Sequence, residues 1–139
     1  MIVIADTNVL ARIVTEDDKL QTEAAFSLFL SATKFVIPTI VFCELAWLLS
    51  RSPKYRKPTA FISNAIRGFL GTKNVAAEND VVLAGLRMLD DGGDFADGVV
   101  QYTGSLLAGA PATFASFDQD AVRRLSARGI TAMVPLPST

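Results

Sequence analysis

Short apolar runs alternate along the chain with longer stretches in which apolar residues recur at helical spacing. The short runs predict strands at residues 2–5, 35–37, 74–76, 113–115 and 130–134. The longer stretches predict helices over about 6–14, 15–32, 38–50, 59–70, 79–90, 94–108 and 119–128. Strands that alternate with helices indicate an α/β fold built around a mainly parallel sheet of about five strands.

The 139 residues contain no linker, repeat or low-complexity tract, so we expect one domain over residues 1–139. The chain reaches an acid at Asp6 and has no run of 18 apolar residues. We therefore expect neither a signal peptide nor a membrane span, and a cytoplasmic location.

The composition restricts the chemistry that the protein can perform. Histidine is absent and Cys43 is the single cysteine, which we interpret as a small core residue. Ser-His-Asp and Cys-His catalysis, histidine-ligated zinc and an intramolecular disulfide are thereby excluded. If the protein is an enzyme, carboxylates and a metal ion are left to do the chemistry.

Four aspartates stand at predicted strand ends or helix starts. Asp6 and Asp118 follow predicted strands, whereas Asp94 and Asp97 lie three residues apart at the start of a helix. Each has an ordinary explanation as a helix cap or a first-turn acid, which stabilises a helix by roughly 1 kcal/mol. If their strands are neighbours, however, Asp6 and Asp118 meet at one edge of the sheet.

Glu44 lies in a helical segment that is otherwise apolar from Val41 to Leu49, and Trp47 of that segment is expected in the core. We expect the Glu44 carboxylate to be partly desolvated, where an unpaired charge is costly. The alternative is an exposed stripe on that helix.

Carboxylates that converge need a cation. Two of them about 5 Å apart repel by roughly 3 kcal/mol at an effective dielectric constant of about 20. Oxygen ligands without histidine or cysteine select a hard ion, Mg²⁺ or Mn²⁺.

The sequence resembles the PIN-domain ribonucleases, and among them the VapC-type toxins of toxin–antitoxin pairs. The resemblance covers nearly the whole chain and rests on Asp6-Thr7-Asn8-Val9-Leu10, Glu44, Asp94-Phe95-Ala96-Asp97 and Ser116-Phe117-Asp118-Gln119-Asp120. It implies a three-layer α/β/α sandwich, a Mg²⁺- or Mn²⁺-dependent endoribonuclease, a homodimer and a cognate antitoxin.

The resemblance also implies roles for single residues. The catalytic and metal-binding acids would be Asp6, Glu44, Asp97 and Asp118, supported by Asp94, Asp120, Thr7 and Ser116. Ser116 stands where the family more often has Thr, and this difference keeps a hydroxyl group at the position. Gly98 stands where Ala is commoner, and we expect it to loosen the start of its helix.

RNA is a polyanion, so a protein that binds it needs basic residues at the binding surface. The net charge of this chain is −1, so its basic residues would have to be gathered in one region. Between Arg51 and Lys73 there are six basic residues and no acid. We predict RNA contacts from this region and from the helix after Asp6, at Arg12, Arg51, Lys54, Tyr55, Arg56 and Lys57. The alternative is a solvated connection without a binding role.

Two other functions stay open from the sequence. One is a stand-alone PIN nuclease for RNA processing, without an antitoxin. The other, from a different class, is a receiver-like signalling module that is not an enzyme. A receiver needs paired acids after its first strand, where this chain has only Asp6.

Overall fold

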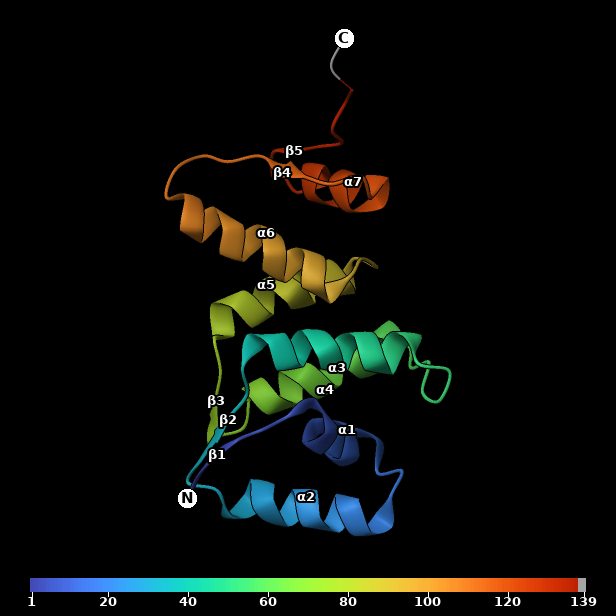
Figure 1. The fold of residues 1–139 in the computed structure, drawn as a ribbon, viewed down its shortest axis with the longest axis vertical. Coiled ribbons are helices and arrows are strands. Elements are labelled where there is room, and N and C mark those ends of the chain that lie inside the picture. The colour runs from blue at the N-terminus through green and yellow to red at the C-terminus, as the bar shows by residue number, and fades with distance from the viewer. Residues whose placement is uncertain (138–139) are drawn as a thin grey trace. The chain divides into compact units, whose positions relative to one another are not determined.

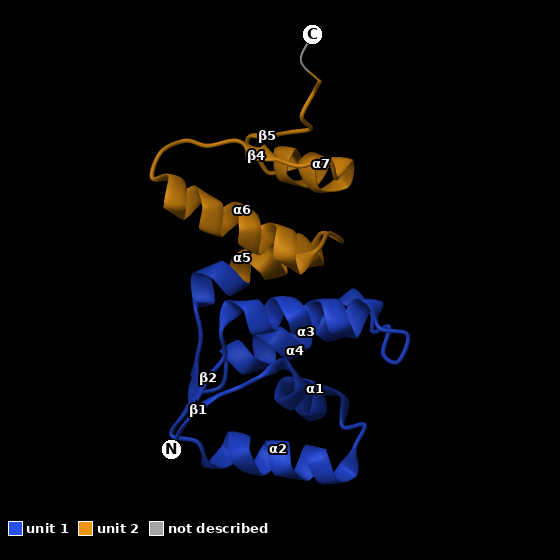
Figure 2. Cartoon of the chain, viewed as in Figure 1, with its two compact units in different colours: residues 1–82 blue, residues 83–139 orange. Residues whose placement is uncertain are grey.

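The computed structural model describes residues 1–137 and divides into two compact units. The first unit runs from Met1 to Val82 and the second begins at Leu83 (Figures 1 and 2). The boundary falls inside helix α5 (Asn79–Asp90). Each unit is described by itself below.

The first unit contains a parallel sheet of three strands, β1 (Ile2–Ile4), β2 (Lys34–Val36) and β3 (Val75–Ala76), in the order β1-β2-β3. Val3 pairs with Phe35, which in turn pairs with Val75. Four helices lie alongside these strands in Figure 1: α1 (Thr7–Thr15), α2 (Lys19–Ser31), α3 (Thr39–Arg51) and α4 (Thr59–Leu70).

Aromatic rings from three helices and a strand contact one another in this unit. The Phe29 ring of α2 lies edge-on to Phe35 of β2 and to Phe69 of α4, with ring centroids 4.9 and 5.9 Å apart. Phe42 of α3 meets Phe69 at 6.5 Å. Edge-to-face pairs of this kind contribute about 0.5–1.5 kcal/mol each beyond the area they bury, so they fix how the helices pack.

The second unit contains α6 (Phe95–Ala108), β4 (Phe114–Ala115), α7 (Gln119–Ala127) and β5 (Ala132–Met133), together with most of α5. Strands β4 and β5 form a parallel pair, in which Phe114 lies opposite Ala132. Gly92, at a φ of 93°, and Gly93 turn the chain between α5 and α6. A positive φ of this size suits glycine and ends α5 where the sequence predicts.

The structure confirms a mixed α/β fold with parallel strand pairing. All five predicted strands form, and their pairs within residues 1–137 are parallel, but they are grouped as sheets of three and two strands. One predicted start is wrong, because α2 begins after Asp18 and not after Thr15. The Asp18 carboxylate accepts a hydrogen bond from the N–H of Gln21, whereas Thr15 closes α1.

The expectation that Trp47 belongs to the core is wrong. Its side chain is 64% exposed, whereas Leu45 and Leu49 on the opposite face of α3 are fully buried. Glu44 and Arg51, three residues before and four residues after Trp47, lie on the same side of the helix and mark the exposed face, although most of the segment is apolar.

Gly98 tightens the packing of α6 instead of loosening it. A Cβ atom at this buried position would lie 2.4 Å from the carbonyl oxygen of Ala84 and 2.9 Å from the Cβ of Met88, both on α5. Gly85 of α5 likewise leaves room for the ring of Phe95. Because these glycines have no side chain, the backbones of α5 and α6 can approach closely in the first turn of α6, which also carries Asp97.

No helix in the described part of the chain is long and apolar enough to cross a membrane.

Alanine substitutions on α6 test the close approach of the α5 and α6 backbones at Gly98. Gly98→Ala is expected to lower the free energy of unfolding by about 1–3 kcal/mol, because the carbonyl of Ala84 cannot move without shifting α5. Gly104→Ala on the same helix meets no atom within 4 Å and is expected to stabilise by about 0.5–1 kcal/mol. Urea unfolding of both variants measures the difference. Equal effects from the two substitutions would contradict the packing.

Candidate metal centre

Asp6 is the N-cap of α1, directly after the first strand. The Ala5 N–H donates to the carbonyl of Val36 at 2.9 Å, which extends the β1–β2 pairing up to this residue. The Asp6 Oδ1 then accepts the N–H of Thr7 at 2.8 Å. The ordinary explanation for this acid is confirmed, and capping fixes its carboxylate at the carboxyl end of the sheet.

Thr7 holds Glu44 in position. Its hydroxyl is buried and donates to Glu44 Oε2 at 2.6 Å, which joins the start of α1 to the middle of α3. A short hydrogen bond to a carboxylate is among the stronger ones in proteins. Glu44 itself is exposed, so the expectation that it is desolvated is wrong and the exposed-stripe alternative is confirmed.

Three aspartates of the second unit come together. One ligand oxygen from each of Asp94, Asp97 and Asp118 lies within 4.8 Å of the others. Asp94 is the N-cap of α6 and Asp97 lies in its first turn, while Asp118 is the N-cap of α7. Two helix starts therefore present their acids to one point, and the spacing of Asp94 and Asp97 predicts that these two lie on the same side of α6.

Hydrogen bonds from the chain on both sides fix Asp118. Its Oδ1 accepts the N–H groups of Asp120 at 3.0 Å and Ala121 at 3.2 Å. Its own N–H donates to the hydroxyl oxygen of Ser116 at 3.0 Å, and the Ser116 N–H donates to the carbonyl of Met133 at 3.1 Å. The predicted supporting hydroxyl at Ser116 thus positions Asp118 from the end of the β4–β5 pair.

Burial raises the pKa of Asp97 above its ordinary value, and the negative charges of Asp94 and Asp118 raise it further. A cation among the three carboxylates would relieve the part of this effect that comes from their mutual repulsion. The donor atoms are all oxygens, which matches the preference of Mg²⁺ or Mn²⁺.

Asp120 lies outside this cluster and serves the surface of α7. It pairs with Arg123 and with Arg124, whose Nε lies 2.8 Å from Asp120 Oδ2. Hydrogen bonds from the two guanidinium groups, with Arg124 the stronger influence, lower the pKa of Asp120. Its contribution to the site runs through its backbone N–H, which helps to cap Asp118.

Comparisons with protein-family models, with curated proteins and with solved structures find no match for this chain. The function therefore has to be argued from the residues themselves.

The four predicted catalytic acids divide between the two units. Asp6 and Glu44 belong to the first, joined through Thr7, whereas Asp97 and Asp118 belong to the second. The structure brings each half together. The convergence of both halves on one ion stays a prediction.

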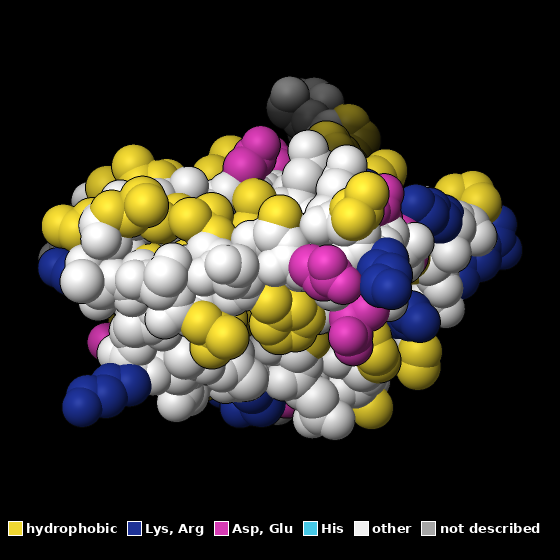
Figure 3. Space-filling view, turned by 90° about the horizontal axis from the view of Figure 1, so that it is seen from below, with side chains coloured by type: hydrophobic (Ala, Val, Ile, Leu, Met, Phe, Trp, Pro, Cys, Tyr) yellow, Lys and Arg dark blue, Asp and Glu magenta, His cyan; other side chains and the backbone are white. Residues whose placement is uncertain are grey.

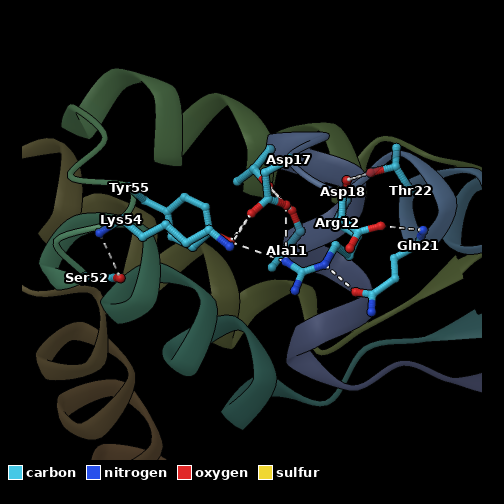
Figure 4. A network of polar contacts seen from close by, with 10 residues as sticks. Ala11, Arg12, Asp17, Asp18, Gln21, Thr22, Ser52, Lys54 and Tyr55 are labelled. Atoms are coloured by element: carbon cyan, nitrogen blue, oxygen red, sulfur yellow. Dashed lines mark hydrogen bonds and ion pairs between the residues drawn. The ribbon is translucent and has the colours of Figure 1, made fainter.

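Three predicted RNA contacts are bonded to an acid that the sequence analysis did not single out. Asp17 accepts a hydrogen bond from the Tyr55 hydroxyl at 2.7 Å and pairs with Lys54 Nζ at 2.8 Å and with Arg12 Nη1 at 3.2 Å (Figure 4). The Thr15 hydroxyl adds a fourth donor at 2.8 Å. This cluster, which we call the Asp17 network, ties the α1–α2 turn to the connection between α3 and α4.

The remaining predicted RNA contacts, Arg51, Arg56 and Lys57, differ in their surroundings. Arg51 and Arg56 are exposed, while Lys57 Nζ lies 4.8 Å from the centre of the Phe61 ring. On the face drawn in Figure 3, acidic and basic side chains lie next to one another. A binding role for this region stays a prediction.

The Asp17 network predicts a pH dependence of stability. Hydrogen bonds from Lys54 and Tyr55 hold the pKa of Asp17 well below its ordinary value. A carboxyl whose pKa is lower in the folded state stabilises the protein above its unfolded pKa of about 3.9, and that contribution is lost as the pH falls toward the folded pKa.

Asp17→Asn is therefore expected to lower Tm at pH 7 by a few degrees and to make the fall in Tm below about pH 5 shallower than in the wild type. Thermal unfolding between neutral and acid pH measures both effects. Glu23→Gln removes a carboxylate from an exposed position on α2 and serves as the matched control. Identical curves for the two variants would show that Asp17 contributes nothing.

Proposed function

We propose that the protein is a Mg²⁺- or Mn²⁺-dependent endoribonuclease that cleaves RNA phosphodiester bonds. The observation that carries the proposal is the convergence of Asp94, Asp97 and Asp118, with the pKa of Asp97 raised by burial and by its two neighbours. Crowded carboxylates at helix starts are costly unless a cation or a proton joins them, which is the arrangement that a metal-dependent nuclease uses.

Asp97 and Asp118 would hold the ion from the second unit, with Asp6 and Glu44 from the first. A bound Mg²⁺ or Mn²⁺ ion lowers the pKa of a coordinated water and neutralises charge that develops at the phosphate. The chain contains no histidine that could act as a general base. Carboxylates are therefore the side chains that would bind the metal ion and accept a proton from water near neutral pH.

The protein's own groups orient these acids before any substrate arrives. The N–H groups of Asp120 and Ala121 use Oδ1 of Asp118, so its second oxygen is not taken by the cap, while the Ser116 hydroxyl accepts the backbone N–H of Asp118. Thr7 aims Glu44 by one hydroxyl bond and also donates its N–H to Asp6. Positioning of this kind lowers the entropy cost of assembling a reactive geometry.

We propose further, from the resemblance to PIN-domain ribonucleases, that the five strands belong to one parallel sheet within a three-layer α/β/α sandwich. The Ile2 and Ile4 side chains of β1 are 66% and 75% exposed, and apolar side chains exposed together on a strand support a further layer that covers them.

The role of a toxin controlled by a cognate antitoxin, and the homodimer that goes with it, are proposed from the resemblance to VapC-type toxins alone. The accessible carboxylates would be the groups that such a partner has to block. An RNA-processing nuclease without an antitoxin would use the same acids.

The catalytic proposal is tested by removing single carboxylates. Asp97→Asn and Asp6→Asn are each expected to reduce Mg²⁺-dependent cleavage of total RNA by more than about 100-fold, because each removes a proposed ligand. Cleavage is measured by sequencing fragment ends. Asp80→Asn, an exposed first-turn acid of α5, is the control that keeps activity. Full activity of Asp97→Asn, or of the wild type in excess EDTA, would refute the proposal.

A further inference from the structure

Trp47 is the single tryptophan of the chain, and it projects from α3 into solvent. Its 64% exposure is unusual for so large an apolar group, because burying an aromatic side chain contributes substantially to stability. The buried face of α3 is complete without it, since Phe42, Leu45 and Leu49 have no exposed surface. Packing in the first unit therefore gives no reason for an indole at this position.

Trp47 shares its face of α3 with a residue of the candidate metal centre. Ile40, Glu44, Trp47 and Arg51 follow one another at intervals of four, three and four residues, so they form one stripe along the helix. Trp47 is one turn beyond Glu44, about 4.5 Å along the helix axis. Glu44 in turn is bonded to Thr7, beside Asp6.

We propose that Trp47 stacks on an unpaired base of the RNA strand whose phosphate is presented at Glu44 and Asp6. The inference rests on the proposed nuclease function and names a residue that fixes the position of its substrate. Stacking on an indole tolerates every base, because each base has a π face. It also selects single-stranded RNA, because the bases of a duplex are already stacked.

The charges around the stripe suit a nucleic acid better than a second apolar surface. Arg51 ends α3 on the same stripe, and Arg56 follows in the connection to α4, so exposed cations lie on the side of Trp47 away from Glu44. A strand that crosses the stripe would meet the proposed metal ligands, then the indole, then these cations. The apolar part of the stripe is limited to Ile40 and Trp47, with Glu44 between them, which is a poor surface for a stable protein interface.

Fluorescence of the single tryptophan reports this contact directly. The full chain, with Mg²⁺ present, is titrated with 2′-O-methylated homopolymers of uridine, adenosine and cytidine of about eight nucleotides, which resist cleavage. At least one of them is expected to quench the Trp47 emission to saturation. An abasic strand with the same number of phosphates is the matched probe, and it is expected to leave the emission unchanged.

Variants separate stacking from charge. Trp47→Leu is expected to raise the Kd for the homopolymer by about 5- to 150-fold, as measured by polarisation of a labelled strand, and to leave the Kd for the abasic strand unchanged. Trp47→Phe is expected to retain part of the affinity. Leu20→Ala, which truncates another highly exposed apolar residue on α2, is the control with no change.

Absence of quenching, or an equal Kd for the wild type and Trp47→Leu, overturns the inference. A change from dimer to monomer in Trp47→Leu by light scattering, without a change in Kd, also overturns it and assigns the stripe to a second copy of the chain. These outcomes are distinct from failure of the catalytic proposal, which is decided by the activity of Asp97→Asn. An inactive Asp97→Asn together with normal RNA binding by Trp47→Leu would remove the stacking alone.

Discussion

Backbone N–H groups at helix starts hold the acidic side chains on which the proposed chemistry depends. Asp6 caps α1 and Asp118 caps α7, each with Oδ1, while Asp94 precedes α6 as its N-cap residue and Asp97 lies in its first turn. The positive end of a helix dipole stabilises a carboxylate and so offsets part of the repulsion between neighbouring acids. The caps made by the Asp6 and Asp118 side chains, which the sequence explains as ordinary stability, therefore also hold two of the acids that the proposed chemistry needs.

Much of the fold could be predicted because its signals are local. Ile2-Val3-Ile4 is a short apolar run that becomes a strand, and Gly92 ends α5 through a positive φ that few other residues adopt. Asp18 shows the limit of such signals. It and Thr15 are both good caps, and only the preceding helix, which continues through Thr15, decides between them.

The candidate site was predictable where a residue type and a strand end coincide, and unpredictable where partners are distant in sequence. Asp94 and Asp97 face the same point, as their spacing suggests, whereas no local pattern places Asp118 beside them. The bond from Thr7 to Glu44 spans 37 residues, and no local pattern indicates it. Gly98 reads from its sequence as a loose point, although it is the position at which α6 touches the backbone of α5. Its role depends on Ala84, which only the folded chain brings near.

The Asp17 network also has a consequence for the order in which the first unit folds. Two donors to the Asp17 carboxylate, Lys54 and Tyr55, lie 37 and 38 positions away, so these two bonds can form only after α1 and α3 have docked and the chain between them has been closed into a loop. Contacts of that kind are expected to be absent from the folding transition state. Losing them would leave the folding rate nearly unchanged and accelerate unfolding. The network thus acts as a latch on a unit that has already assembled, and it governs how long the folded state lasts more than how quickly it is reached.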